Sequence, residues 1–462
     1  MRLQFILLLT LGTVFSASAN SDSLMMRHIS DHIMMKGKCY DDLRVLCKDI
    51  GNRLSASPEA EKAVIWGKKT LEDAGADRVW LQPVSVPHWH RGNERLAFSF
   101  EEANGKMSVN MTEVKMTSLG NTVGTDGKML TAPVIMVNDF DEFAALPRKE
   151  VEGKIVYFNY RFRQDLIHTF KGYSDAGPYR WKSPSIASRK GAVAVIIRSV
   201  STGLDDAPHT GSLGYEEGVR PIPAVAIGNT TADMLERKFK KGKVSATIQS
   251  DCKMMENKIS YNVIGEIKGS EHPEKIVLVC GHLDSWDIGE GAHDDGAGCV
   301  QSIEVIRAFK ELGIKPKYTI RAVLFMNEEN GLKGGYAYAD SAKSRHEHHI
   351  LGIESDAGGF SPRGFSLDMS EEQIAQITAY KKYFEEYGVY NFGERHGGAD
   401  ITPIHRAGMP AAGLLPDVQR YFDLHHTEND VFEKVNHREL KLGAVVMAQL
   451  IYLISEHGLV NE

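Results

Sequence analysis

Residues 280–299, CGHLDSWDIGEGAHDDGAGC, bring two pairs of metal-binding side chains to either side of a glycine-rich turn. His282 and Asp284 precede the turn, and Asp294 and Asp295 follow it. Imidazole nitrogen and carboxylate oxygen are donors that zinc and harder divalent cations prefer. This stretch therefore predicts one half of a metal site.

Donors of the same kind occur at three later places in the chain: Glu328 with Glu329, Asp356, and His425 with His426. Each has an ordinary explanation when taken singly, since a strand-end carboxylate is more often a turn or helix cap than a ligand. Together they provide two sets of histidine plus carboxylate. Two ions about 3.5–4 Å apart need one carboxylate that bridges them, and the residues alone leave Asp294 and Asp295 open for that role.

The elements around these residues predict how the donors meet. Residues 275–280 form an apolar run of strand length, typical of a strand buried on both faces of a sheet, and residues 302–312 have helical spacing. Residues 318–327 and 349–355 are further strand patterns, each followed by candidate ligands. Because open α/β sheets place their sites at the carboxyl ends of strands, we expect the donors to share one sheet edge.

The size and composition of the chain are those of a globular protein with more than one domain. It has 462 residues, of which 42% are hydrophobic and 25% are charged. The net charge of −7, with acidic and basic residues well mixed, gives no support to a nucleic-acid or membrane partner. These two function classes are therefore not favoured.

Residues 1–19 have the basic start, short apolar run and small-residue cleavage pattern of a signal peptide, which predicts secretion. The apolar run is shorter than the roughly 20 residues that span a bilayer. The lumen of the secretory pathway or of the lysosome is an alternative destination. Residues 20–40 are either a removable pro-segment of a zymogen or a tail packed on the domain.

Five cysteines in a chain of this size do not predict a disulfide scaffold. Cys280 and Cys299 fall in the predicted strand and helix, where we expect buried thiols. A disulfide is expected among the remaining three, with the pairing left open: Cys39, Cys47 and Cys252. Asn110 and Asn229 begin glycosylation acceptor sequences, in agreement with secretion.

Residues 41–123 and 252–462 are expected to form one domain, which residues 124–251 interrupt. The interrupting residues carry short strand patterns at 132–137, 153–158, 192–197 and 222–227. The segments EGKIV, SRKGAVAVII and IPAV within them, in that order, resemble the protease-associated domain, a small β-rich module inserted into some secreted peptidases. The resemblance implies that this module restricts substrate access.

The order of the candidate ligands, His-x-Asp, Asp-Asp-Gly, Glu-Glu, Asp and His-Thr-x-x-Asp, resembles that of the M28 family of zinc exopeptidases from about residue 40 to the end. The resemblance implies an α/β fold with a mixed central sheet and helices on both faces, two zinc ions per chain, and a homodimer. Carried over position by position, it implies five ligands, with Asp294 as the bridge: His282, Asp294, Glu329, Asp356 and His426.

Peptide hydrolysis needs a nucleophile at neutral pH, and zinc lowers the pKa of a bound water from about 16 to about 7. A neighbouring carboxylate must take the proton and return it to the leaving amine, and the resemblance implies Glu328 for this role. Asp284, two residues after His282, is expected to accept the second imidazole N–H and to fix the tautomer.

Residues 397–404, GGADITPI, stand where the family has an S-D-H-x-P-F segment, with Ile401 in place of the histidine. His396 and Asp400 are the candidate substrate-binding residues here. The resemblance implies a carboxypeptidase or dipeptidase that acts on dipeptides or short peptides. An aminopeptidase is the first alternative. A receptor-like protein without catalysis is the second, and the intact ligands together with Glu328 argue against it.

Overall fold

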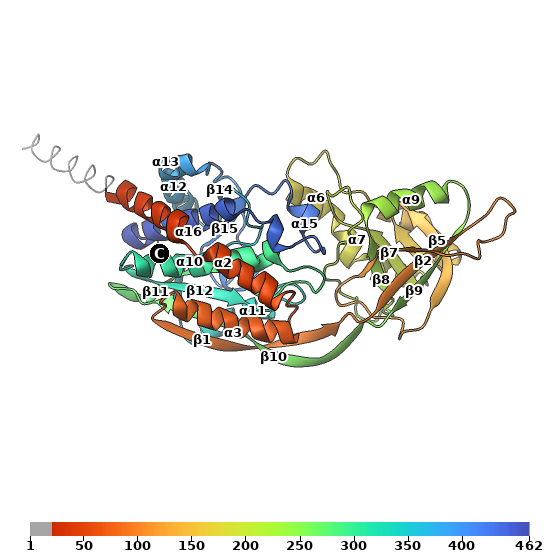
Figure 1. Ribbon diagram of the computed structural model, residues 1–462, viewed down its shortest axis with the longest axis horizontal. Coiled ribbons are helices and arrows are strands. Elements are labelled where there is room, and N and C mark those ends of the chain that lie inside the picture. Colours follow the sequence, from red (N-terminus) through yellow and green to blue (C-terminus); the bar gives the residue numbers. More distant parts are fainter. Residues whose placement is uncertain (1–20, 462) are drawn as a thin grey trace, which may run out of the picture.

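The structure is a computed structural model that describes residues 21–461, so the predicted signal peptide lies outside the described residues. A seven-stranded and an eight-stranded sheet form two lobes along the longest axis of the molecule (Figure 1). The architecture is mixed α/β, as the sequence predicts. Within residues 21–461, no helix combines the length and apolar character needed to cross a membrane.

The first lobe is built on the seven-stranded sheet, here called the main sheet. In spatial order its strands are β1 (Arg78–His90), β10 (Lys253–Ile267), β12 (Tyr318–Phe325), β11 (His272–His282), β13 (His348–Glu354), β15 (Ala411–Pro416) and β14 (Pro362–Asp368). Strands β12, β11, β13 and β15 are parallel, and the outer strands join them antiparallel. The carboxyl ends of the four parallel strands therefore share one edge.

Helices cover both faces of the main sheet. The larger ones are α3 (Pro58–Asp73), α10 (Ala297–Glu311) and α16 (His437–His457) on one face, and α11 (Lys333–Ser344) with α14 (Thr402–His405) on the other. The shorter helices of this lobe are α2 (Cys39–Arg44), α12 (Glu371–Ala379), α13 (Lys381–Phe384) and α15 (Tyr421–Leu424). Short helical turns also occur at Val45–Ile50, Ala292–Gly296, Glu385–Tyr387 and Phe432–Lys434.

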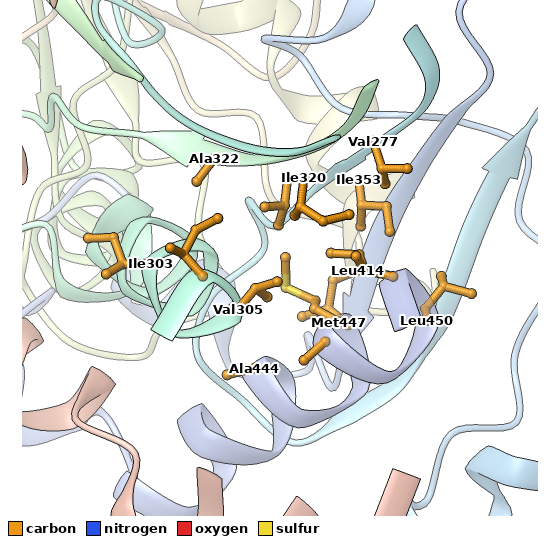
Figure 2. Close-up of a cluster of buried hydrophobic side chains, with 14 of the residues drawn as sticks. Val277, Ile303, Val305, Ile320, Ala322, Ile353, Leu414, Ala444, Met447 and Leu450 are labelled. Carbon is orange, nitrogen blue, oxygen red and sulfur yellow. The ribbon is translucent and has the colours of Figure 1, made fainter. Parts of the chain in front are cut away.

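The central strands are apolar along their whole length because both of their faces are covered. Successive residues of a strand point to opposite faces, so Ile320 and Ala322 of β12 pack with α10 and α16, whereas Val323 and Phe325 pack with α11. Figure 2 shows the first of these two cores, in which Met447 of α16 approaches the sheet. Burial on both faces explains the continuous apolar runs in the sequence.

The second lobe is built on the eight-stranded sheet. In spatial order its strands are β3 (Thr112–Val114), β2 (Glu94–Phe100), β9 (Val244–Ser250), β5 (Leu130–Val137), β6 (Ile155–Phe158), β7 (Ala194–Arg198), β8 (Ala224–Ile227) and β4 (Thr117–Ser118). Its helices are α4 (Phe140–Ala145), α5 (Arg148–Val151), α6 (Thr169–Ala176), α7 (Pro178–Trp181), α8 (Ser183–Arg189) and α9 (Asn229–Phe239). Strands β5 to β8 are parallel, and helices lie between β5 and β7 along the chain. The lobe is therefore itself α/β.

Two long strands connect the lobes. β1 and β10 pair antiparallel from Arg78 opposite Glu266 to His90 opposite Lys253, and they run along the main sheet toward the second lobe (Figure 1). The chain continues from β1 into β2 and returns from β9 into β10. The second sheet therefore uses residues 94–250, which include residues 94–123 that the sequence patterns assign to the first domain.

Residues 21–36 form a helix that packs against the first lobe. Met26, Ile29 and Ile33 are buried in the same apolar cluster as α16. The side chain of Gln449 in α16 donates a hydrogen bond to the Met26 carbonyl at 2.9 Å. Of the two alternatives for residues 20–40, this packing favours the tail bound to the domain.

All five cysteines are buried free thiols, so the expectation of a disulfide among Cys39, Cys47 and Cys252 is wrong. Cys39 and Cys47 belong to one apolar cluster, and Cys252 belongs to another that contains Trp89 and Trp286. The thiols therefore behave as small apolar side chains.

The two predicted glycosylation sites differ in their surroundings. Asn110 is exposed between β2 and β3. Asn229 begins α9, where its Nδ2 donates to the Gly203 carbonyl at 2.7 Å and its Oδ1 accepts from Arg198 at 3.2 Å. Because a glycan is attached through the side-chain nitrogen of asparagine, Asn110 suits this modification and Asn229 does not.

Candidate metal centre

His282 is the last residue of β11 and is fully buried at the carboxyl edge of the main sheet. The parallel neighbours of β11 end beside it, and His282 pairs with Phe325, the last residue of β12. The chain then continues from β12 to Glu328 and Glu329, and from β13 to Asp356. The sheet thus delivers donors from three strand ends to one place.

Asp294 lies between the two candidate histidine ligands. Its Oδ1 is 3.1 Å from Nε2 of His282, and its Oδ2 is 3.3 Å from Nε2 of His426. Burial alone would raise the pKa of Asp294, but the hydrogen bond with His282 and the ion pair with His426 hold it well below the usual range. An ionised carboxylate that presents one oxygen to each histidine has the arrangement required of a bridge between two ions.

A further carboxylate lies beside each of the two histidines. Oδ1 of Asp356 is 3.4 Å from Nε2 of His282, and Oε2 of Glu329 is 3.1 Å from Nε2 of His426. Ligand atoms bound at about 2 Å to one tetrahedral ion lie roughly 3.3 Å from each other. The donor types and their spacing are therefore those of candidate metal-binding groups, which also include His425 beside Asp294 and Asp295 beside His282.

Asp284 fixes the turn that carries the two glutamates. Its carboxylate accepts three successive backbone N–H groups: Asn327 at 2.7 Å, Glu328 at 3.1 Å and Glu329 at 3.4 Å. The expectation that this carboxylate accepts the imidazole N–H of His282 is wrong. Nδ1 of His282 lies 3.0 Å from the backbone carbonyl of Asp284 and 3.9 Å from its carboxylate. A carbonyl group therefore fixes the tautomer of His282.

Burial controls the protonation of the remaining groups. It raises the pKa of Glu328 well above its usual range, although His282 opposes the shift, and it raises the pKa of Glu329 to about 7. Burial lowers the pKa of His426, but Glu329 and then Asp294 outweigh it and raise this pKa to about 9. A cation that binds here must therefore displace protons at neutral pH.

Arg53 holds the loop between His282 and Asp294, a role that no local sequence pattern predicts. Its guanidinium is fully buried and donates to three carbonyls of that loop: Leu283 at 2.5 Å, Glu290 at 2.6 Å and Gly291 at 2.8 Å. These partners lie 230 or more positions along the chain. Local patterns around Arg53 could therefore not reveal it.

Two buried carboxylates support the same loop from other sides. Asp430 accepts the backbone N–H groups of His293 at 2.8 Å and Asp294 at 3.1 Å. Asp295 accepts the N–H of His282 at 3.0 Å and the N–H of Gly298 at 2.9 Å, which caps the first turn of α10. Asp295 therefore supports the backbone, while Asp294 faces both histidines.

The centre opens into a cavity of about 460 Å³ that both lobes line. From the first lobe, Tyr421 and His425 line this cavity together with the carboxylates of the centre and that of Glu328. From the second lobe, the lining residues are Phe170, Tyr173, Arg180 and Ser212. The ring of His425 stacks on His426 at 3.5 Å, and its Nε2 is 3.7 Å from Oδ2 of Asp294. The sequence marks His425 only by its adjacency to His426, whereas Arg180 carried no local signal.

The two candidate substrate residues are placed differently. His396 is exposed and lines a groove of about 1020 Å³ that also reaches Asp356. Asp400 is 1% exposed, and its carboxylate oxygens have no hydrogen-bond partner among residues 21–461. Burial and Glu354 raise the pKa of Asp400 well above its usual range. The structure thus places His396 on an open groove and Asp400 in the interior.

The fold and the centre define a metallopeptidase, and the chain belongs to peptidase family M28. The family model matches residues 262–451. Carboxypeptidase Q from Homo sapiens is 34% identical over 424 residues, which cover 91% of this chain and 86% of that protein. A solved peptidase M28 precursor from Shewanella amazonensis SB2B is 31% identical, with a TM-score of 0.87 over 94% of this chain and 97% of that one. An aminopeptidase from Bacillus subtilis (strain 168) is 24% identical, with 96% of this chain and 91% of that protein covered.

Proposed function

We propose that this protein is a secreted dinuclear zinc exopeptidase that hydrolyses dipeptides or short peptides, of the carboxypeptidase or dipeptidase type. The observation that carries the proposal is Asp294, which presents one oxygen to each histidine. His282 and Asp356 would hold one ion, and His426 and Glu329 would hold the other. Zinc suits a buried site made of imidazole and carboxylate donors.

When bound, the two cations would supply Lewis acidity and an activated water as the nucleophile. Glu328 is the general base of this proposal, because it lines the cavity next to Glu329 and is not one of the donors that surround the two histidines. Its raised pKa suits a group that takes up a proton and passes it to the leaving amine. Asp284 contributes by fixing the backbone of Glu328.

Arg180 is the residue we assign to the free carboxylate of the substrate. It is 6% exposed, it lines the cavity, and its Nη2 donates to the Tyr173 hydroxyl at 2.6 Å. Among the described residues that line this cavity, Arg180 is the one lysine or arginine, and the four carboxylates already belong to the centre. A guanidinium pairs well with a carboxylate, whereas a free amine would need a further acid. This distribution favours recognition of a carboxyl terminus.

Replacement of the base tests the reaction. Glu328→Gln should lower kcat by about 10²–10⁴-fold, because the carboxamide cannot accept the proton. Two zinc ions per chain should remain bound. Glu433→Gln, an exposed change away from the cavity, should leave kcat unchanged. Hydrolysis that persists in Glu328→Gln with metal bound would remove Glu328 from the mechanism.

Blocked dipeptides test which terminus is recognised. For the native enzyme, C-terminal amidation should lower kcat/KM more than N-terminal acetylation. In Arg180→Met the penalty for amidation should disappear, and Arg180→Lys should retain part of it. The Bacillus subtilis relative makes an aminopeptidase the second candidate. A larger loss on acetylation than on amidation would establish that alternative.

The second lobe, residues 94–250, fits the role of a protease-associated module that narrows access to the cavity, since it contributes one wall. Secretion, a glycan on Asn110 and a homodimer complete the proposal. Expression of the whole chain in a secreting host tests all three through the location, glycan mass and oligomeric state of the product. An intracellular, unmodified monomer would contradict them.

A further inference from the structure

His426 occupies an unusual backbone conformation for a metal ligand. Its φ is +62°, in the left-handed region that residues other than glycine rarely adopt. Such a conformation persists where the surrounding structure imposes it. The contacts that hold His426 are therefore part of how the centre is built.

Thr210 of the second lobe contacts His426 at two points. The Thr210 N–H donates to the His426 carbonyl at 2.9 Å, and the Thr210 carbonyl lies 3.3 Å from Nδ1 of His426. Nη1 of Arg180 is 3.4 Å from the same Nδ1, but a guanidinium has no acceptor. With Nδ1 as the donor to Thr210, Nε2 is the ring nitrogen that faces Glu329 and Asp294.

Thr210 is in turn fixed within its own lobe. Its side chain is 1% exposed, and its hydroxyl donates to the carbonyl of Ser118 in β4 at 2.9 Å. The N–H of the preceding residue, His209, donates to the hydroxyl of Ser199 at 2.8 Å. The position of the Thr210 backbone therefore follows the second sheet rather than the loop that carries His426.

The other histidine does not depend on the second lobe. Nδ1 of His282 is satisfied by the carbonyl of Asp284, two residues away in the same loop. Groups that accept the outer N–H of a ligand histidine set its orientation and usually change metal affinity by about 10–100-fold. The two sides of Asp294 therefore differ in which lobe orients their histidine.

On this basis we propose that Thr210 is a positioning residue for His426, so that affinity for the ion on the Glu329 side depends on docking of the second lobe. The inference rests on the proposed dinuclear site. It predicts that a change at Thr210 lowers the affinity for the ion on the Glu329 side and leaves the affinity for the ion on the Asp356 side unchanged.

Metal affinity measured in the whole protein tests this inference. Zinc per chain is recorded while a chelator is titrated into the native protein and its variants. Thr210→Val removes the hydroxyl that anchors the residue. It should lower the affinity for one of the two ions by about 10-fold and leave the affinity for the other unchanged. Thr210→Ser keeps the hydroxyl and should restore the native affinity. Thr210→Pro removes the N–H that holds the His426 carbonyl and should have the larger effect.

Thr231→Val is the matched control, because Thr231 is also a buried threonine of the second lobe whose hydroxyl donates, here to Asp206 at 2.9 Å. It should leave both affinities unchanged. Hydrogen exchange of the native protein provides a second readout, in which zinc should slow exchange of the Thr210 N–H. Equal affinities in native and Thr210→Val protein, or equal weakening of both ions, would overturn the inference alone. A native protein that binds fewer than two ions would overturn the proposed function as well.

Discussion

The two halves of the metal centre are built in different ways. His282 ends a central strand of the main sheet, is fully buried, and is oriented by a carbonyl of its own loop. His426 lies in the loop after α15 with a left-handed backbone, and Thr210 of the other lobe contacts both its ring and its carbonyl. On our proposal, the first half therefore forms with the main sheet, whereas the second half also depends on the docked second lobe.

The docking contacts combine polar pairs with an aromatic cluster, in which Phe162 and Tyr173 of the second lobe pack on Phe422. Ser201 donates to the Phe422 carbonyl at 2.8 Å, and Thr202 donates to Asp423 at 2.6 Å, both just before His426 in the chain. Gly120 of the second lobe packs so closely on Trp286 that a Cβ at this position would lie 1.8 Å from the indole. Interfaces between domains of one chain commonly permit relative motion. The half of the centre that spans the interface is therefore the half expected to open first.

Loss of the residue that both halves share should have the largest effect. Asp294→Asn removes the negative charge between the histidines and should release both ions, with hydrolysis reduced to background. Asp73→Asn, an exposed carboxylate of α3 that pairs with Lys69, is the control and should keep both ions. Metal analysis alongside a dipeptide assay makes the comparison. An active Asp294→Asn enzyme with two ions would show that the halves are not joined through this residue.

Arg53→Met should lower the affinity for the ion on the His282 side, whereas Thr210→Val should lower the affinity for the ion on the His426 side. Arg53→Met leaves the Leu283 and Glu290 carbonyls without a donor and removes one of the two donors to the Gly291 carbonyl, at a cost of about 2 kcal/mol or more in the free energy of unfolding. The ion on the His282 side should be weakened first, because the loop after His282 loses its support.

Arg307→Met is the control for Arg53, since Arg307 is also buried in the first lobe but pairs with Glu304 and Asp42 away from the centre. It should lower stability with little change in metal affinity. Denaturant unfolding and chelator titration measure the two quantities. Equal metal loss in both variants would mean that Arg53 acts only through global stability.

A cavity in the core of either lobe should change the order in which the two ions are released on heating. Ile196 is fully buried in the second lobe and Met447 is fully buried in the first, so replacement of either by alanine should cost about 2–5 kcal/mol. On heating, Ile196→Ala should release the ion on the His426 side before the other ion. Met447→Ala should release both together, as followed by a zinc-sensitive dye during thermal unfolding. The same order of release in both variants would contradict the division between the halves.

The smallest expected effect is a change in stability with pH, which arises from Glu329 and His426 in the second half of the centre. The pKa of Glu329 is raised from 4.5 to about 7, and that of His426 from 6.5 to about 9. A group whose pKa is raised by folding stabilises the protein below its unfolded pKa, and this contribution is lost as the pH rises through the folded value. Chelator-treated protein should therefore lose stability between about pH 5 and pH 9.

Bound zinc requires Glu329 and His426 in their deprotonated forms. The difference in the free energy of unfolding between zinc-loaded and chelator-treated protein should therefore widen from pH 6 to pH 9, by about 1 kcal/mol per pH unit for each titrating group. Scanning calorimetry over this range provides the measurement. A constant difference would mean that neither group exchanges its proton for the cation.

Much of the fold could be predicted from local patterns. Residues 275–280 and 318–327 correspond to β11 and β12, and the Ser57 cap with Pro58 begins α3, where the Ser57 hydroxyl accepts the Ala60 N–H at 3.0 Å. These features depend on the period of apolar residues and on turn chemistry within a few positions. The helical spacing begins at residue 302, whereas α10 begins at Ala297 after its N-cap Gly296. The Gly298 N–H donates to Asp295, whose role as a ligand or a support only the fold decides.

The sequence by itself determined the kinds of donors and the strand ends that carry them, because the donors at the strand ends closely follow the apolar runs that form those strands. Only the tertiary structure decided that Asp284 supports the glutamate turn, that Arg53 holds the ligand loop, and that Arg180 lines the cavity. Their partners are mostly backbone groups or side chains far along the chain, and the contact of Thr210 with His426 spans 216 positions. Backbone carbonyls and N–H groups look the same at every residue, so no sequence pattern marks which of them will meet a ligand histidine.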